Sequence, residues 1–327
     1  MKRLGKLRHL KNLGELDLQC LPSDDVKNFT KAIPIIKRSW PNISATLRSL
    51  TLRVPFECLK ALLSPSLSFP RLTHLKIHVF TTEHSTNLTD AINSTLLPFI
   101  NRHAPTVERL AIITPDTCPV DLSPMFASLQ PFPRLKSLEL ELSAFRLEQL
   151  NLSGVSQFLH VQALQLEELR LHFVRVRGLR EEEFDANAFF ALPFFHIHLP
   201  TLTTLDLGFS GFRDGKGAAT MRYVHRFAST LQRLVLQHIF LAQRGLVRLV
   251  KPLIALQTLK IATTYFTPEI LDTLSNEVPD LTELHVRCVN YDGGHNRSSE
   301  VCLCLLSDFL DSGMLNITFS VQWMFQT

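Results

Sequence analysis

The sequence lacks any long apolar run. No stretch reaches the roughly 18 uncharged apolar residues that a membrane-spanning helix needs. The most hydrophobic region, residues 246–261, is interrupted by Arg248, Lys251 and Lys260. The N-terminus is basic but enters no apolar segment of signal-peptide length. We therefore expect neither a transmembrane segment nor a signal peptide, and no membrane partner.

Cysteine and net charge are also scarce. The six cysteines show no framework spacing, which favours a reduced, intracellular protein of the cytoplasm or nucleus. Lysine and arginine number 34 and aspartate and glutamate 30, so the formal net charge is only +4. Nucleic-acid-binding domains concentrate much more positive charge on one face. We do not expect a nucleic acid as the main partner.

One pattern favours a different compartment. Sites of the type N-x-S/T are more frequent than the roughly two expected by chance. Seven occur, at Asn28, Asn42, Asn87, Asn93, Asn151, Asn296 and Asn316. Their use would require entry into the secretory pathway, so a secreted, glycosylated protein stays open as an alternative.

The sequence is rich in one repeated phrase, L-x-x-L-x-L, in which Ile or Val also fills the last position. Successive copies lie 25 to 36 residues apart and begin at Leu13, Leu47, Leu72, Val107, Leu135, Leu166, Leu202, Leu231, Leu256 and Leu281. A recurring phrase of this kind is the signature of leucine-rich repeats. A final strand-like run, residues 315–321, is expected to close the stack as an atypical cap.

The apolar spacing changes within each repeat. The L-x-L alternation predicts a half-buried strand with its leucines inward. Between strands the spacing is helical, as in the stripes at 246–253 and 270–278. Further helices are expected at 24–40, 85–103, 146–161, 217–229 and 299–310.

Stacking such units predicts the architecture. Parallel strands lie about 4.8 Å apart, whereas packed helices need about 8–10 Å, so an array of both must curve. We predict an α/β leucine-rich-repeat solenoid of about 10–11 irregular repeats, with a parallel sheet on its concave face and helices on its convex face. We expect residues 1–327 to form this single domain.

Proline marks the approach to five of the strands. It stands two residues before the first apolar residue of the phrase, at Pro70, Pro105, Pro133, Pro200 and Pro279. Because proline cannot continue a helix and favours extended neighbours, it should stop the helix and start the strand.

These proline-led phrases carry a resemblance. Phe69-Pro-Arg-Leu, Phe132-Pro-Arg-Leu and Leu199-Pro-Thr-Leu resemble the leucine-rich arrays of fungal F-box proteins, over nearly the whole chain. The resemblance implies a non-catalytic protein-recognition module, the substrate-recognition part of an F-box type (SCF) ubiquitin-ligase adaptor. A stand-alone intracellular scaffold is the alternative.

The chain departs from that family in two respects. The ninth position of each repeat, normally Asn or Cys, holds other residues, so the usual asparagine ladder is missing. No F-box is seen either. Leu21-Pro-Ser-Asp-Asp resembles its opening but follows a repeat strand, and Asp24 fits the N-cap of the first helix. A Skp-type adaptor is expected as a partner only if an F-box precedes Met1.

No group of residues indicates catalysis. The glycine-rich segment 208–217 lacks the spacing of a phosphate-binding loop and reads as a turn before a helix. His196 and His198 could share one face of a strand, and Cys302 and Cys304 form a similar pair. Neither pair has a second pair at metal-site spacing. We predict no catalytic residue, no metal, no cofactor and no enzyme activity.

Residues 178–199 form an aromatic-rich insert in the longest repeat. Its phenylalanines are Phe184, Phe189, Phe190, Phe194 and Phe195. We expect them to fill the core; an exposed aromatic anchor for a partner is the alternative.

The strand alternation fixes which residues point away from the helices. We predict that these form a protein-binding surface on the concave face, basic, then acidic, then basic along the array. Simple solvation of outward polar residues is the alternative. The candidates are Arg53, His74, Lys76, His78, Arg109, Glu139, Glu141, Glu168, Arg170, His172, Arg233, Lys260, His285 and Arg287.

Overall fold

The computed structural model describes residues 12–20, 26–64, 66–81, 88–115, 119–147, 150–176, 185–212, 217–263, 268–288 and 316–321. The chain divides into two compact units. Unit 1 comprises Met1–Leu179 with His196–His198, and unit 2 comprises Arg180–Phe195 with Leu199–Thr327. A single domain for the whole chain stays a prediction.

Unit 1 alternates strands with helices. In chain order these are β1 (Glu15–Gln19), α1 (Val26–Ile43), β2 (Ser49–Arg53), α2 (Phe56–Leu62), β3 (His74–His78), α3 (Leu88–His103), β4 (Arg109–Ile113), α4 (Ser123–Ala127), β5 (Ser137–Ala144), α5 (Ser153–Gln162) and β6 (Glu168–Arg175).

Unit 2 repeats the same alternation. It contains α6 (Ala186–Phe190), all but the last residue of the 3-10 helix η3 (Pro193–His196), β7 (Thr204–Ser210), α7 (Gly217–Val224), the 3-10 helix η4 (His225–Phe227), β8 (Arg233–Leu241), α8 (Gln243–Val250), β9 (Thr258–Thr263), α9 (Pro268–Glu277), β10 (Glu283–Cys288) and β11 (Asn316–Val321).

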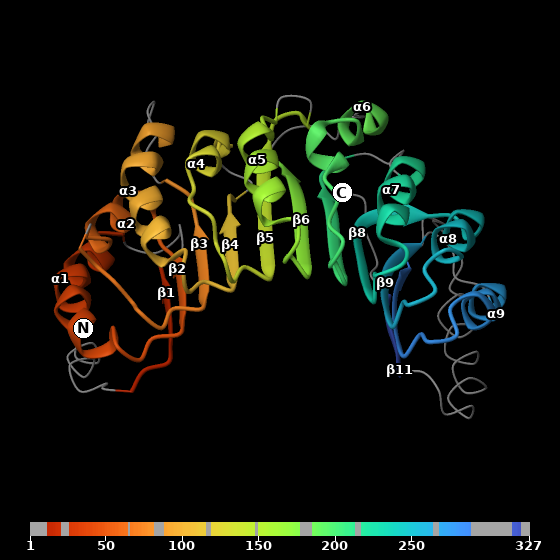
Figure 1. Ribbon diagram of the computed structural model, residues 1–327, viewed down its shortest axis with the longest axis horizontal. Coiled ribbons are helices and arrows are strands. Elements are labelled where there is room, and N and C mark those ends of the chain that lie inside the picture. The colour runs from red at the N-terminus through yellow and green to blue at the C-terminus, as the bar shows by residue number, and fades with distance from the viewer. Residues whose placement is uncertain are drawn as a thin grey trace. The chain divides into compact units, whose positions relative to one another are not determined.

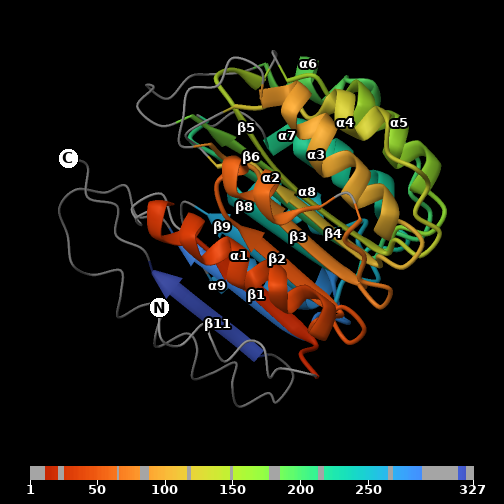
Figure 2. The ribbon, with the colours of Figure 1, turned by 90° about the vertical axis from the view of Figure 1, so that its left-hand side faces the viewer.

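The strands of each unit form a parallel sheet in sequence order. Figure 2 shows β1 to β4 side by side with a common direction. The second leucine of each phrase pairs with its counterpart in the next repeat, as in Leu50 with Leu75 and Leu75 with Leu110. All ten phrases form strands, and the run at 315–321 contains β11. The predicted α/β leucine-rich-repeat architecture is therefore confirmed.

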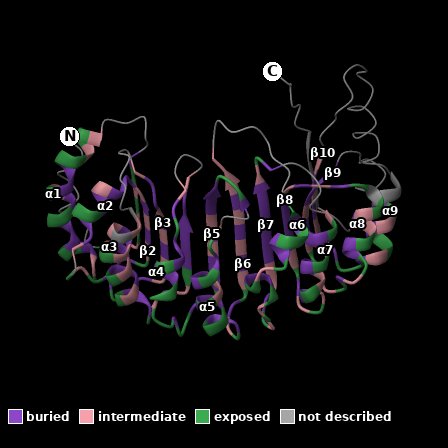
Figure 3. Cartoon of the chain, turned by 90° about the horizontal axis from the view of Figure 1, so that it is seen from above, coloured by how far each residue is buried: buried purple, intermediate pink, exposed green. Residues whose placement is uncertain are grey.

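The core lies between the strands and the helices that cover one face of each sheet (Figure 1). In Figure 3 the strands show buried residues alternating with half-buried ones, and exposed residues lie mainly on helices and loops. Leu47, Leu50 and Leu52 have no exposed surface. Burying such side chains contributes about 1.5–3 kcal/mol each, so the phrase that defines the repeat also supplies its stability.

The five strand-leading prolines behave as predicted. Each lies in a turn, and the strand starts four residues later, as in Pro70 before His74 and Pro279 before Glu283. The first leucine of the phrase lies just before the strand and packs beneath it; Leu72 is fully buried.

Helix boundaries match the sequence unevenly. Those predicted at 24–40, 85–103 and 217–229 appear as α1, α3 and α7 with η4, whereas α5 starts seven residues later than predicted. The Asn151 side chain accepts a hydrogen bond from the Ser153 backbone N–H at 3.2 Å, which holds the chain in a turn before the helix. Helices α2 and α4 were not predicted because seven and five residues are too few to show periodicity. The helix predicted at 299–310 lies outside the described residues, as do Leu21 and Asp24.

The aromatic insert packs inward, as predicted. Phe189, Phe190, Phe194 and Phe195 are at most 9% exposed. They contact one another edge-on or tilted at 4.7–5.7 Å between ring centroids and reach Tyr223 on α7. Edge-to-face pairs add about 0.5–1.5 kcal/mol beyond area burial. Phe184 lies outside the described residues.

Two buried threonines link neighbouring repeats where the asparagine ladder is missing. Thr114 Oγ1 donates to the Glu141 carbonyl at 3.0 Å and accepts from the Ser143 N–H at 2.8 Å. In unit 2, Thr263 Oγ1 donates to the Leu241 carbonyl at 3.0 Å. Each threonine stands one residue before the ninth position, so a shorter side chain satisfies some of the backbone groups that a ladder asparagine would reach.

Candidate partner-binding surface

The surface of each sheet that faces away from the helices is called here the strand face. All fourteen predicted residues lie on strands of these two sheets. Arg109 is exposed and the other thirteen are half-buried. The neighbouring leucines in the same strands are buried, so the period-two alternation predicted both sets correctly. Their role in partner binding stays a prediction.

In unit 1 an ion pair spans two strand intervals. Lys76 on β3 and Glu139 on β5 flank Ala111 on the strand between them, β4. Each of the two is in register with Ala111. Lys76 Nζ nevertheless lies 2.9 Å from Glu139 Oε1. The methyl side chain of Ala111 leaves room for the two long side chains to meet above it.

Two further contacts arrange the charges of this face. Glu168 Oε1 accepts hydrogen bonds from Arg170 Nε at 2.7 Å and from Arg170 Nη2. Arg53 Nε donates to His78 Nε2 at 3.4 Å. Burial, together with the nearby Arg53 and Lys76 cations, lowers the pKa of His78 to about 4. His78 is therefore neutral at physiological pH and serves as an acceptor.

The two ion pairs, Lys76–Glu139 and Arg170–Glu168, border a hollow of about 210 Å³ on strands β2 to β6. Its lining combines the outward residues with the edges of the buried leucines: Ser49, Leu50, Thr51, His74, Leu75, Lys76, Arg109, Leu110, Ala111, Ser137, Glu139, Glu168 and Arg170. Small residues on the two central strands, Ala111 and Ser137, create the depression. The charged residues are predictable from the alternation in the sequence, but the hollow is not, because it depends on the small residues between them.

Unit 2 carries a carboxylate that the prediction omitted. Glu283 lies 3.4 Å from Arg233 Nη1, 3.5 Å from Lys260 Nζ and 2.5 Å from His285 Nε2. It also accepts a hydrogen bond from Thr258 Oγ1 at 3.0 Å. The group predicted as basic is thus centred on a glutamate. The sequence contains the signal that identifies this residue, because Glu283 occupies the same position of the repeat phrase as Arg233 and Glu168.

This clustering determines the charge of Glu283. The pKa of Glu283 is lowered to about 2, mainly by the hydrogen bond from His285. Thr258 and Lys260 lower this pKa further. The carboxylate stays ionised over the physiological range. It partly neutralises the surrounding cations, so this face of unit 2 is less basic than the sequence indicated.

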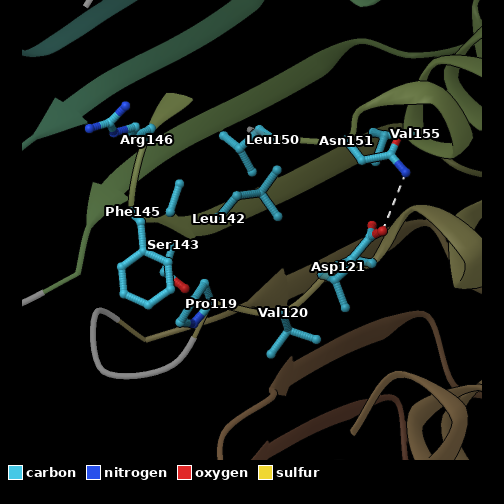
Figure 4. Close-up of a pocket in the computed structure, with 12 residues that line it drawn as sticks. Pro119, Val120, Asp121, Leu142, Ser143, Phe145, Arg146, Leu150, Asn151 and Val155 are labelled. Atoms are coloured by element: carbon cyan, nitrogen blue, oxygen red, sulfur yellow. Dashed lines mark hydrogen bonds between the residues drawn. The ribbon is translucent and has the colours of Figure 1, made fainter. Parts of the chain in front are cut away.

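A second hollow of about 210 Å³ lies where β5 ends, outside the strand face (Figure 4). Val120 and Leu142 form its apolar wall, and the Phe145 ring, 50% exposed, stands at its edge. Asn151 Nδ2 donates to Asp121 Oδ2 at 3.3 Å. The other carboxylate oxygen of Asp121 accepts from the Ser123 N–H at 2.8 Å. These polar groups hold the turns before α4 and α5 together.

The paired histidines noted in the sequence form no metal site among the described residues. His196 ends the 3-10 helix η3 and His198 lies in the turn before β7, so the suggestion that both share a strand is wrong. The reason is that Pro193 begins the 3-10 helix and that Phe194 and Phe195, just before His196, are buried in the core, so no strand forms here. In the part of the chain that the structure describes, no cluster of three or more His, Cys, Asp or Glu could hold a metal ion. Cys302 and Cys304 lie outside that part.

The remaining observations concern the glycine-rich segment and the helices. Gly208 belongs to β7, Gly211 lies in a turn and Gly217 begins α7, so the strand extends into the predicted turn; residues 213–216 lie outside the described residues. No helix in the described ranges combines the length and apolar character needed to cross a membrane.

Comparisons with known proteins give little beyond the fold. No family model matches the sequence. No curated protein matches it either. Among solved structures, the chain is similar to one in the crystal structure of the Rad7 and Elc1 complex in yeast. That match has 12% sequence identity, covers 90% of each chain and has a TM-score of 0.40. A likeness this distant says nothing about what this chain binds.

Proposed function

We propose that this protein is a non-catalytic module that recognises another protein through its strand face. One observation carries the proposal: outward strand residues surround a hollow on unit 1, and ion pairs hold several of their charges in place. Charges fixed in this way give a docking surface specificity and a fast association rate without requiring the partner to order them.

The finer proposal concerns the biological role. The proline-led repeat phrases resemble those of fungal F-box proteins, and this favours the substrate-recognition part of a ubiquitin-ligase adaptor. In that case a Skp-type adaptor binds an F-box that lies outside the described residues, and the strand face binds the substrate. A stand-alone intracellular scaffold would use the same face without a ligase.

Purification from native cells separates these roles. The protein, tagged at its C-terminus, is isolated and its companions are identified by mass spectrometry. Recovery of a Skp-type adaptor and a cullin supports the ligase role. Recovery of other proteins without either one supports the scaffold.

Charge reversal then tests the binding face itself. Glu139→Lys with Glu141→Lys should change the affinity for the purified companion at least about tenfold, because it breaks the Lys76–Glu139 ion pair and reverses two charges on the strand face. Asp272→Lys with Glu277→Lys on α9 changes the net charge equally but lies on a helix. If both double variants bind as the unmodified chain does, the strand face is not the recognition surface.

A further inference from the structure

The hollow on unit 1 contains one cation, Arg109, that forms no ion pair with any residue that the structure describes. Lys76 is paired with Glu139, and Arg170 with Glu168. Arg109 lines the same hollow and is exposed. Among the residues that the structure describes, its guanidinium makes no ion pair and donates no hydrogen bond.

The strand register shows which ion pair Arg109 could have formed. Arg109 pairs with Ser137, which pairs with Glu168, so cation, small residue and carboxylate repeat the arrangement of Lys76, Ala111 and Glu139. The matching ion pair does not form among the described residues; the Glu168 carboxylate instead accepts hydrogen bonds from Nε and Nη2 of Arg170.

The surroundings of Arg109 suit an anion. His74 lies beside it in register, and burial and the Arg109 charge lower the pKa of His74, so the ring is neutral at physiological pH. Ser137 lies beside it in register on the other side and lines the same hollow. The lining holds three cations and two carboxylates, an excess of one positive charge.

We propose that this hollow anchors an acidic side chain of the protein partner, with the carboxylate seated on the Arg109 guanidinium between His74 and Ser137. This rests on the proposed function and specifies it further. A guanidinium and a carboxylate can form two parallel hydrogen bonds, which fixes the orientation of the incoming group. The ion pairs on either side are already satisfied, so the hollow accepts one carboxylate and not a run of them.

A nucleic acid fits this site less well. Its backbone presents many phosphates, and binding depends on several cations acting together. Here Glu139 and Glu168 stand in the same hollow and would repel neighbouring phosphates. The occupant that matches the charge pattern is an isolated Asp or Glu on a peptide segment.

The test selects a library of random peptides against the full chain and measures the affinity of recovered peptides by fluorescence anisotropy. We expect recovered peptides to share an Asp or Glu whose change to Asn or Gln abolishes binding. Arg109→Gln should weaken binding about tenfold or more, and Arg109→Lys less, because charge remains but the two-bond geometry is lost. Arg71→Gln, an equally exposed arginine in the loop before β3, should leave the affinity unchanged.

A second variant guards against a merely structural effect. Glu168→Gln removes one carboxylate from the hollow, so acidic peptides should bind more tightly, a gain that damage to the fold cannot produce. No recovered peptides, recovered peptides without an acidic residue, or acidic peptides insensitive to Arg109→Gln would overturn the proposal. Tighter, Arg109-dependent binding of a single-stranded oligonucleotide would replace the peptide with a nucleic acid.

The same variants distinguish this inference from the proposed function. If Arg109→Gln leaves the affinity for the natural companion unchanged while the Glu139→Lys and Glu141→Lys variant changes it, the strand face still recognises that protein. Only the carboxylate anchor would then be wrong.

Discussion

Lys76 Nζ lies 2.9 Å from Glu139 Oε1, although their strands, β3 and β5, are separated by β4. Arg233 and Glu283 repeat this relationship in unit 2, across Thr258 on β9. In both cases a small residue on the middle strand lets two long side chains meet above it. The strand face is therefore connected over three repeats at a time and not only between neighbours.

The Lys76–Glu139 pair should contribute little to stability. Its side chains are 34% and 26% exposed, and exposed ion pairs contribute about 0.2–1 kcal/mol. A double-mutant cycle with Lys76→Met and Glu139→Gln, followed by urea unfolding, should give a coupling free energy in that range that falls as salt is added. The Lys136–Glu167 pair, 59% and 50% exposed, should give a smaller value. A coupling well above this range would mean that the pair stabilises the sheet and not merely its surface charges.

Gly154→Ala should destabilise the protein. A Cβ at Gly154 would lie 1.9 Å from the Ser123 carbonyl oxygen, a backbone atom that cannot move alone. We expect a loss of at least about 1–3 kcal/mol in the free energy of unfolding, the usual range for overpacking.

Gly245→Ala is the matched control on α8. Its Cβ would meet only Leu241 Cδ2, at an ordinary 3.9 Å, and alanine is favoured over glycine in a helix by up to about 1 kcal/mol. We expect this variant to be at least as stable as the unmodified chain. Thermal unfolding of both variants measures the contrast, and equal effects would contradict the close approach of α4 and α5.

Thr114→Val should expose the role of the buried threonine. Valine keeps the shape but removes the hydroxyl, so the hydrogen bonds of Thr114 Oγ1 to the Ser143 N–H and the Glu141 carbonyl are lost. A buried hydrogen bond contributes about 0.5–1.5 kcal/mol, a loss that urea unfolding should detect. Thr114→Ser keeps the hydroxyl and should lose less. If valine is tolerated as well as serine, the threonine does not replace the ladder.

The protein should lose stability in mild acid through His103. This side chain is 2% exposed; its Nε2 accepts from the Phe69 N–H at 2.9 Å, and its Nδ1 lies 2.8 Å from the Phe99 carbonyl. Burial lowers the pKa of His103 below its ordinary 6.5, despite the opposing effect of the Phe99 carbonyl. The unfolded chain therefore takes up a proton first as pH falls through about 6.5, and stability present above that pH is lost below it.

Urea unfolding at neutral pH and at about pH 5 measures this loss, which we expect to be on the order of 1 kcal/mol from His103. His103→Gln should reduce the pH dependence, and the exposed His160→Gln should not. His78, with a pKa of about 4, contributes in the same direction, so some dependence persists in the variant. A pH dependence unchanged by His103→Gln would contradict the neutral buried imidazole.

The architecture could be predicted from the sequence because each repeat contains a recognisable leucine phrase. The leucines at Leu50 and Leu52 are both the motif and the buried core, so the pattern read in the sequence is the physical cause of the fold. The same alternation identified which residues face outward. Short helices such as α4 escaped notice, since five residues cannot display a 3.6-residue period.

The details of the candidate site could not be predicted in this way. Outward residues were chosen by charge, so Ala111 and Ser137, whose small size makes the hollow, did not stand out. The sequence also does not show the pairing: the side-chain contacts show that Glu168 accepts hydrogen bonds from Arg170 and that Arg109 has no ion pair among the described residues. Glu283 shows the same limit, because a list of charges by strand does not show that one carboxylate gathers three cations.

Site-specific photo-cross-linking tests most directly whether the strand face recognises a partner. A photoreactive phenylalanine at Thr51, beside the unit 1 hollow, and another at Lys60, exposed on α2, are compared in the presence of the companion purified from native cells. The account predicts a covalent adduct from position 51 and none from position 60. An adduct from position 60 alone would place the partner on the helical side and contradict the account.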